Sequence, residues 1–307
     1  MTRLAGIDIG TNTIRMIVAE RDGKRFRCVA RHRAIVGMGR RLRETGRVGE
    51  REVSAALVVL RKFRREMDRL GVAQYRACGT ACLREASNRE AFLAAAADEG
   101  VEIEVIGPAE EARMAWEGIR TGVAGRPGDV AMDIGGGSTE FAVGPGEGDS
   151  VSIPMGVVVI STLLPLSDPP EPWELRAVSY YVARRIEDGT RVFGRRRFRR
   201  LIGTAGTFTT LAALEKRMTR YDPARIQGAT LSAAAVRRWT ERLCGMTDAR
   251  RLRLPGMEKG RERYIVPGAL MALAALRRFG MDRLTVSDAG LLEGVLASIG
   301  TNGGEDA

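Results

Sequence analysis

Two short turns contain the residues best suited to chemistry in this sequence, because each combines an aspartate with glycine and hydroxyl side chains. The first turn comprises Asp8, Gly10, Thr11, Asn12 and Thr13, and the second comprises Asp133, Gly135, Gly136, Gly137, Ser138 and Thr139. Glycine lets backbone N–H groups converge closely on a ligand, and such groups bind phosphate oxygens. The hydroxyl groups add further donors. The two turns therefore predict binding of a phosphate-like anion.

Strands are predicted on both sides of each turn. Apolar residues run from Leu4 to Ile9 and from Val130 to Ile134, and apolar residues resume after each turn. A Walker loop and a Rossmann turn both lead into a helix, so neither motif matches. A single turn of this kind is often only a hairpin. The two copies here are offset by 125 residues (133 − 8 = 125), which indicates an internal duplication.

The segments around the turns predict an α/β protein. Apolar residues follow helical spacing over 53–70, 109–122, 172–192, 232–244, 266–279 and 290–299. Ser87 with Glu90 predicts a capping box that opens a further helix. Strands are predicted over 25–35, 75–78, 101–106, 201–202 and 284–286. A third glycine turn over 203–207 precedes a helix that extends through Leu214.

The clearest domain boundary is the segment 125–128, where Gly and Pro occur together between two periodic segments. With 307 residues the chain is about twice a typical domain length of ~150 residues. We predict a first domain over 1–124 and a second over 125–290. A C-terminal helix and tail cover 291–307, with packing back on the first domain as one option.

The composition is that of a globular protein with a basic surface. Hydrophobic residues make up 44% and charged residues 28%, which excludes a disordered chain. Aromatic residues make up only 5%, which argues against nucleic-acid binding by base stacking. The net charge is +11, and 45 of the 49 basic residues are arginine (49 − 4 lysines). A GC-rich genome explains this bias, and so does an acidic ligand held by guanidinium groups.

The cysteines and the single histidine do not form a zinc motif. Cys28, Cys78, Cys82 and Cys244 lack C-x-x-C spacing, and His32 is the only histidine. Scattered thiols are typical of a reducing cytosol. No apolar run approaches the ~18 residues of a membrane span, and no signal peptide is indicated. We therefore expect a cytoplasmic protein that does not bind a membrane.

The doubled hairpin resembles the superfamily of actin, Hsp70 chaperones and sugar kinases. That resemblance implies two ribonuclease-H-like domains flanking an active-site cleft. Five further segments resemble the exopolyphosphatase and guanosine pentaphosphate phosphohydrolase (Ppx/GppA) family, in its short form, and they follow the family's order along nearly the whole chain. These segments are 79–86, 110–113, 133–141, 203–210 and 287–294.

The family resemblance implies two catalytic residues in the first domain. Glu111 matches the glutamate that orients or deprotonates the attacking water. It lies in the first turn of a predicted helix, where the helix dipole favours a charged carboxylate, although acidic residues are common stabilisers there. Arg84 matches an arginine that grips the terminal phosphate or stabilises its transition state. An isolated arginine at such a place would be a solvated surface charge.

The resemblance also implies a metal and further phosphate contacts. Asp133, counted among the catalytic residues, and Glu140 match the carboxylates that hold a divalent cation, usually Mg²⁺, which prefers oxygen ligands. Asp8 is the equivalent of Asp133 in the first domain and could contact the metal through water. Gly206 and Thr207 complete the phosphate contacts from the second domain.

The function implied is exopolyphosphatase activity, in which the terminal phosphate of inorganic polyphosphate is hydrolysed to orthophosphate. One alternative is removal of the 5′ γ-phosphate of guanosine pentaphosphate, and others are a kinase of the same superfold and a non-catalytic sensor of polyphosphate or of guanosine penta- or tetraphosphate. The Glu-Glu-Ala-Arg segment argues against the kinase. Relatives often form homodimers, although no exposed apolar stripe indicates one here. Leu292 and Arg263 depart from the family, where Arg and an acidic residue are common.

Overall fold

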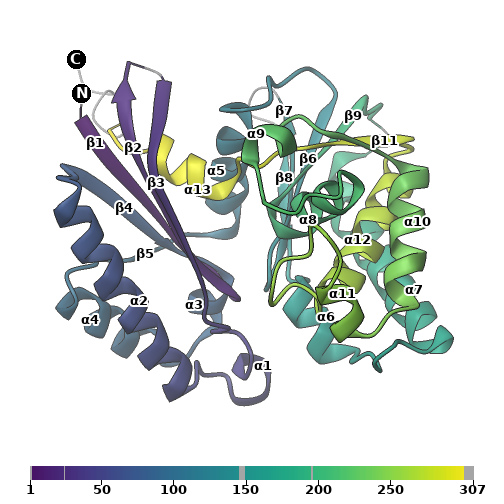
Figure 1. Ribbon diagram of the computed structural model, residues 1–307, viewed down its shortest axis with the longest axis horizontal. Coiled ribbons are helices and arrows are strands. Elements are labelled where there is room, and N and C mark those ends of the chain that lie inside the picture. Colours follow the sequence, from purple (N-terminus) through teal and green to yellow (C-terminus); the bar gives the residue numbers. More distant parts are fainter. Residues whose placement is uncertain (1, 24, 145–148, 195, 301–307) are drawn as a thin grey trace. The chain divides into compact units, whose positions relative to one another are not determined.

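The computed structural model describes residues 2–23, 25–144, 149–194 and 196–300, and the chain divides into two compact units. Unit 1 consists of Met1–Gly118 and Leu291–Ala307, and unit 2 consists of Ile119–Gly290. The division falls in the last turn of a helix, a few residues before the Gly/Pro segment at 125–128. Each unit contains one sheet with helices packed on it (Figure 1).

Unit 1 contains a five-stranded sheet with the order β3-β2-β1-β4-β5. Its strands are β1 (Thr2–Ile9), β2 (Thr13–Asp22), β3 (Arg25–Ile35), β4 (Gln74–Gly79) and β5 (Glu104–Val105). Its helices are α1 (Leu42–Thr45), α2 (Glu50–Arg69), α3 (Ala81–Glu85), α4 (Arg89–Asp98), α5 (Pro108–Arg120), whose last two residues belong to unit 2, and α13 (Leu291–Ala297). β1 pairs antiparallel with β2 and parallel with β4.

Unit 2 contains a six-stranded sheet with the order β10-β11-β9-β6-β7-β8. Its strands are β6 (Asp129–Ile134), β7 (Thr139–Gly144), β8 (Ser150–Ile153), β9 (Arg200–Thr204), β10 (Thr230–Ser232) and β11 (Arg283–Val286). Its helices are α6 (Val157–Leu163), α7 (Pro172–Gly189), the 3-10 turn η1 (Arg191–Phe193), α8 (Ala205–Glu215), α9 (Pro223–Ile226), α10 (Ala233–Cys244), α11 (Asp248–Leu252) and α12 (Ile265–Arg278).

The two sheets repeat one topology. In unit 2, β6 pairs antiparallel with β7 and parallel with β9, just as β1 pairs with β2 and β4 in unit 1. Each glycine turn joins the first two strands of its sheet. The predicted α/β class is thus confirmed, and the duplication seen in the sequence extends to the strand order.

Alternating side chains of β1 pack against helices on both faces of the sheet in unit 1. Ile7 and Ile9 belong to the core that also contains Leu60 of α2 and Phe92 of α4. On the other face, Leu4 packs with helix α13. Helix α13 can approach the sheet closely because Gly6 has no side chain; a Cβ there would lie 3.1 Å from the Leu292 carbonyl oxygen.

Leu292, one of the two departures from the family, is part of this core. Its side chain is buried with Leu4, Ile17 and Leu296, so the apolar residue suits its surroundings. The other departure, Arg263, is exposed, and its Nε lies 3.7 Å from Oδ2 of Asp248. Neither residue lies in the glycine turns.

Two local predictions need correction. Helix α4 has no capping box: Asn88 occupies the N-cap position without a side-chain capping bond, while Ser87 Oγ donates to the Gly46 carbonyl at 2.9 Å. These polar side chains are used for contacts with the segment before α2, which local spacing does not reveal. The strand predicted over 101–106 is reduced to the two residues of β5.

Among the described helices, none has the combined length and hydropathy of a membrane span.

Candidate active site

The glycine turn of unit 1 joins β1 to β2 and is closed by a hydrogen bond from Gly10 N–H to the Thr13 carbonyl, 3.0 Å long. Its carbonyl groups are used by the chain after β3: Gly39 N–H donates to Thr11 O at 2.8 Å, and Gly37 N–H donates to Asn12 O at 3.0 Å. The N–H groups of Thr11 and Asn12 donate to no residue that the structure describes. A turn with satisfied carbonyls and available N–H groups is suited to an anion.

The glycine turn of unit 2 has the same construction. Gly135 N–H donates to Ser138 O at 3.0 Å, and the first residues of α6 donate to the carbonyls of Gly135 and Gly136. Within the described part of the chain, the N–H groups of Gly136 and Gly137 have no acceptor. Thr139 Oγ1 donates to the Met155 carbonyl at 2.6 Å, so this hydroxyl anchors the start of β7. The turn therefore offers an anion its backbone N–H groups rather than the Thr139 hydroxyl.

Asp8, at the end of β1, forms an ion pair with Arg15. The two residues are directly opposite each other in the β1–β2 register, and Oδ2 of Asp8 accepts from Nε of Arg15 at 2.8 Å and from Nη2 at 2.5 Å. The Asp8 side chain is 4% exposed and that of Arg15 is 28% exposed. Arginine thus neutralises a buried carboxylate beside the first turn.

Asp133, at the equivalent position in unit 2, is opposite another carboxylate. The β6–β7 register pairs it with Glu140, and both residues are buried. Ser152 Oγ donates to Oε1 of Glu140 at 2.7 Å. Carboxylate oxygens are ligands that hard cations prefer. The pair therefore forms an oxygen-rich position suited to a hard cation.

Asp133 and Glu140 alone are too few ligands for a metal site built entirely from protein side chains. Among the described residues, no group of three or more His, Cys, Asp or Glu side chains could hold a metal. Mg²⁺ is commonly held by one or two carboxylates, with water and substrate phosphates as the other ligands. The residues present fit that kind of cation.

Glu111 lies in the first turn of α5 and contacts Arg84. Its side chain is buried, and its Oε2 accepts from Nη1 of Arg84 at 2.6 Å. The same nitrogen donates to the Ile106 carbonyl at 3.0 Å. The neighbouring Glu110 pairs instead with Arg76, 2.8 Å away. The two adjacent glutamates thus have different partners, and the guanidinium group of Arg84 orients Glu111.

The third glycine turn joins β9 to α8 in unit 2. Ala205 has a φ of +66°, which is unusual for a residue other than glycine and marks a strained position. Thr207 is buried under α12, where the absence of a side chain at Gly268 makes room for it. A Cβ at Gly206 would lie 1.1 Å from Nη1 of Arg261, so this guanidinium group lies directly against the turn.

Comparison with known proteins connects these features to a family. The Ppx/GppA phosphatase family matches residues 16–302. A protein of Mycobacterium tuberculosis named Exopolyphosphatase 2 is 34% identical over 97% of this chain and 99% of its own length. This chain belongs to the Ppx/GppA phosphatase family.

Solved structures of the family have the same fold. The Aquifex aeolicus Ppx/GppA protein shares 30% identity and a TM-score of 0.84, with 97% of each chain covered. An exopolyphosphatase from Cytophaga hutchinsonii shares 28% identity and a TM-score of 0.89, with 96% of each chain covered. The predicted family and its two-domain actin-like fold are confirmed.

Within this Ppx/GppA protein, the predicted site residues divide between the units. Unit 1 contains Asp8, Gly10, Thr11, Asn12, Thr13, Arg84 and Glu111, and unit 2 contains Asp133, Gly135, Gly136, Gly137, Ser138, Thr139, Glu140, Gly206 and Thr207. Sequence reasoning missed Arg15 and Arg261. The strand register opposite Asp8 could have identified Arg15, whereas no local pattern connects Arg261 with a turn 55 residues earlier (261 − 206 = 55).

Proposed function

We propose that this protein is an exopolyphosphatase that hydrolyses the terminal phosphoanhydride bond of inorganic polyphosphate. The observation that carries the proposal is the pair Asp133 and Glu140 beside the turn with available N–H groups, because it combines cation ligands with phosphate donors. The name of the M. tuberculosis relative agrees with it. The same site acting on guanosine pentaphosphate would also release orthophosphate, so that nucleotide is the second substrate to test.

In the proposed reaction, water attacks the terminal phosphorus atom in line with the bridging oxygen. The new P–O bond forms to water, the bridging P–O bond breaks, and the shortened chain leaves with the bonding electron pair. Glu111 receives the proton of the attacking water, and Arg84 holds that carboxylate in place. The N–H groups of the glycine turns and Gly206 with Thr207 bind phosphate oxygens. Arg261, whose Nε donates to Oε2 of Glu258 at 2.9 Å, lies against the third turn.

Asp133 and Glu140 would hold the divalent cation, proposed to be Mg²⁺. Such an ion neutralises charge on phosphate oxygens when it is bound. Asp8 is paired with Arg15, whereas Asp133 lies opposite a second carboxylate. We infer that the first turn contributes phosphate donors and that the second contributes the cation ligands.

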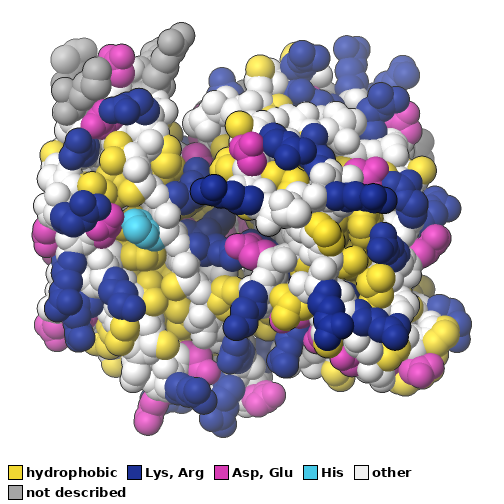
Figure 2. Space-filling model, in the orientation of Figure 1, with side chains coloured by type: hydrophobic (Ala, Val, Ile, Leu, Met, Phe, Trp, Pro, Cys, Tyr) yellow, Lys and Arg dark blue, Asp and Glu magenta, His cyan; other side chains and the backbone are white. Residues whose placement is uncertain are grey.

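The charge of the whole protein supports a polyanionic substrate. The net charge is +11, and Lys and Arg side chains are spread over the face of each unit that Figure 2 shows. A positive field raises the local concentration of polyanions and accelerates their binding at low ionic strength. We therefore expect kcat/KM for polyphosphate to fall as salt is added.

The decisive experiment measures phosphate release from polyphosphate in the presence of Mg²⁺ by the wild type and by Glu111→Gln. The substitution should lower kcat by about 10² to 10⁴-fold, because it removes the general base. Glu110→Gln is the matched control: it changes the adjacent glutamate, which pairs with Arg76, and should retain activity within about threefold, as expected for a partly exposed ion pair.

Parallel assays separate the alternatives. Release from guanosine pentaphosphate but not from polyphosphate would replace the proposed substrate with the nucleotide. Binding of either ligand by the wild type without any phosphate release would favour a sensor. The homodimer stays a prediction, which light scattering tests. A cytoplasmic location is likewise proposed, and the four free cysteines agree with a reducing compartment.

A further inference from the structure

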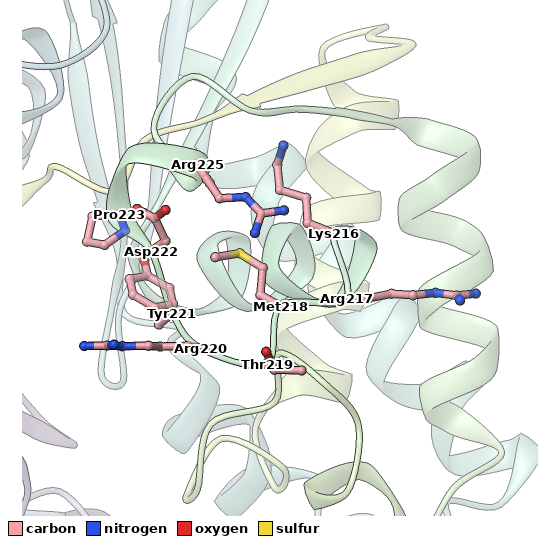
Figure 3. Close-up of a pocket in the computed structure, with 9 residues that line it drawn as sticks. All are labelled: Lys216, Arg217, Met218, Thr219, Arg220, Tyr221, Asp222, Pro223 and Arg225. Atoms are coloured by element: carbon pink, nitrogen blue, oxygen red, sulfur yellow. The ribbon is translucent and has the colours of Figure 1, made fainter.

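A group of basic side chains outside the candidate active site lines an open pocket of about 580 Å³ in unit 2 (Figure 3). The pocket lies between the end of α8 and helix α9. Its lining comprises Lys216, Arg217, Met218, Thr219, Arg220, Tyr221, Asp222, Pro223 and Arg225. None of these residues belongs to the glycine turns, and the proposed reaction does not use them.

Among the described residues, no ion pair compensates the positive charge of this pocket. It contains four cations and one carboxylate, and the Asp222 carboxylate is used as the N-cap of α9, accepting from Ala224 N–H at 3.0 Å. None of the four cations forms an ion pair with a residue that the structure describes. Glu215, which precedes Lys216 in the chain, pairs instead with Arg238. Mutually repelling cations around a concave surface favour an anionic ligand.

The side chains do not all face the pocket. In Figure 3, the guanidinium group of Arg225 points toward the Lys216 side chain above Met218, and Arg220 extends beneath Tyr221. Arg217 points away from them. Lys216 and Arg225 thus lie at one end of the pocket, and Arg220 lies at the other end beside Tyr221.

Hydrogen bonds fix the backbone at the C-terminal end of α8. Helix α8 ends in a Schellman motif, in which Met218 N–H donates to the Ala213 carbonyl and Arg217 N–H donates to the Leu214 carbonyl, both at 3.0 Å. Arg217 occupies the left-handed position with a φ of +48°, where glycine is usual, and Met218 is buried behind it. These hydrogen bonds fix the backbone from which Lys216 and Arg217 project.

Tyr221 connects this pocket to the third glycine turn. Its hydroxyl donates to Oδ1 of Asp288, and it also interacts with Thr209 in the second turn of α8. Asp288 follows Ser287, whose N–H donates to the Gly203 carbonyl at 2.9 Å. The segment after α8 thus runs back along the helix, from Lys216 at its C-terminal end toward the turn with Gly206 at its N-terminal end. Since α8 has 11 residues, the two ends are about 16 Å apart.

We propose that this pocket binds phosphates of the polyphosphate chain that are remote from the one being cut, with Lys216, Arg220 and Arg225 as their contacts. The proposal rests on the proposed function for its substrate class. A short substrate held at the third turn would not reach the far end of α8. A long chain would reach it, so the pocket would give the enzyme a preference for polymers.

The test compares long polyphosphate with tripolyphosphate in the triple variant Lys216→Gln, Arg220→Gln, Arg225→Gln. KM for the long polymer should rise about tenfold, at roughly 0.5 kcal/mol for each exposed contact, while kcat/KM for tripolyphosphate stays within about twofold. The matched control, Arg176→Gln, Arg237→Gln, Arg250→Gln, removes the same charge from exposed positions on α7, α10 and α11, and should leave both values within about twofold.

Equal losses for the two substrates, or an equal rise of KM in the control variant, would overturn the proposal. Calorimetric titration of both variants with long polyphosphate separates it from the proposed function, because binding is measured without turnover. An inactive wild type whose affinity for polyphosphate still depends on these three cations would refute the hydrolase and retain the pocket. If the triple variant binds guanosine pentaphosphate more weakly than the wild type does but binds the polymer equally well, the proposal is overturned and the pocket is assigned to a nucleotide.

Discussion

The glycine turns of the two units have the same backbone but opposite charges at one position. Gly10 and Gly135 form equivalent closing hydrogen bonds of 3.0 Å, and each turn follows an aspartate on the first strand of its sheet. The residue opposite that aspartate is Arg15 in unit 1 and Glu140 in unit 2, again 125 residues apart (140 − 15 = 125). An arginine pairs with the first aspartate, whereas the residue opposite the second aspartate is another carboxylate.

Under the proposed function, this difference would give one duplicated element two roles without a change of fold. Backbone N–H groups make both turns suitable for phosphate. The opposite side chain then determines whether a cation is also favoured. The strand register places that side chain directly across from the aspartate, so a single substitution is enough to change the charge of the site.

The largest effect is expected when the second hairpin is given the charge pattern of the first. Glu140→Arg would pair with Asp133 as Arg15 pairs with Asp8, and would remove the proposed cation ligands. Phosphate release should fall by about 10³-fold, equivalent to about 4 kcal/mol, and should no longer respond to Mg²⁺.

The measurement is the rate of phosphate release over a Mg²⁺ titration, with binding of Mn²⁺ followed by electron paramagnetic resonance as a readout that needs no turnover. Circular dichroism establishes that the variant folds. A folded variant that keeps both its activity and its Mn²⁺ binding would refute the assigned difference between the hairpins.

A smaller effect, on stability, is expected in the first hairpin. Arg15→Gln leaves the buried Asp8 carboxylate without its guanidinium partner and should lower the free energy of unfolding by about 2–3 kcal/mol, somewhat less than for a fully buried pair because Arg15 is partly exposed. Urea denaturation measures the loss. The double variant Asp8→Asn, Arg15→Gln should recover at least half of it, and no recovery would show that the ion pair is not the cause.

The smallest effects are expected from substitutions that test the shared backbone. A Cβ at Gly10 would lie 3.2 Å from the Thr13 carbonyl oxygen, and a Cβ at Gly135 would lie 3.0 Å from that of Ser138. Gly10→Ala and Gly135→Ala should each destabilise the protein by about 1 kcal/mol. Thermal unfolding of the two variants under matched conditions checks the equivalence, and losses that differ by more than about 2 kcal/mol would contradict it.

Much of the architecture is encoded in short segments. The apolar strands, the turn residues and the repeat at an offset of 125 residues predicted both hairpins and the α/β class. The capping box at Ser87 failed because Ser87 and Asn88 bond to the segment before α2. Local spacing cannot report a partner 40 residues away in the chain.

Residue types and their spacing determined which groups could bind phosphate and a cation, since strands, turns and family segments are local in the sequence. Tertiary structure alone decided that Arg84 contacts Glu111, that Arg261 lies against Gly206, and that Lys216, Arg220 and Arg225 line one pocket. These contacts join residues that are distant in the chain, and packing of helices on the sheets brings them together. Side-chain charges act over a few ångströms, so their partners are set by the fold.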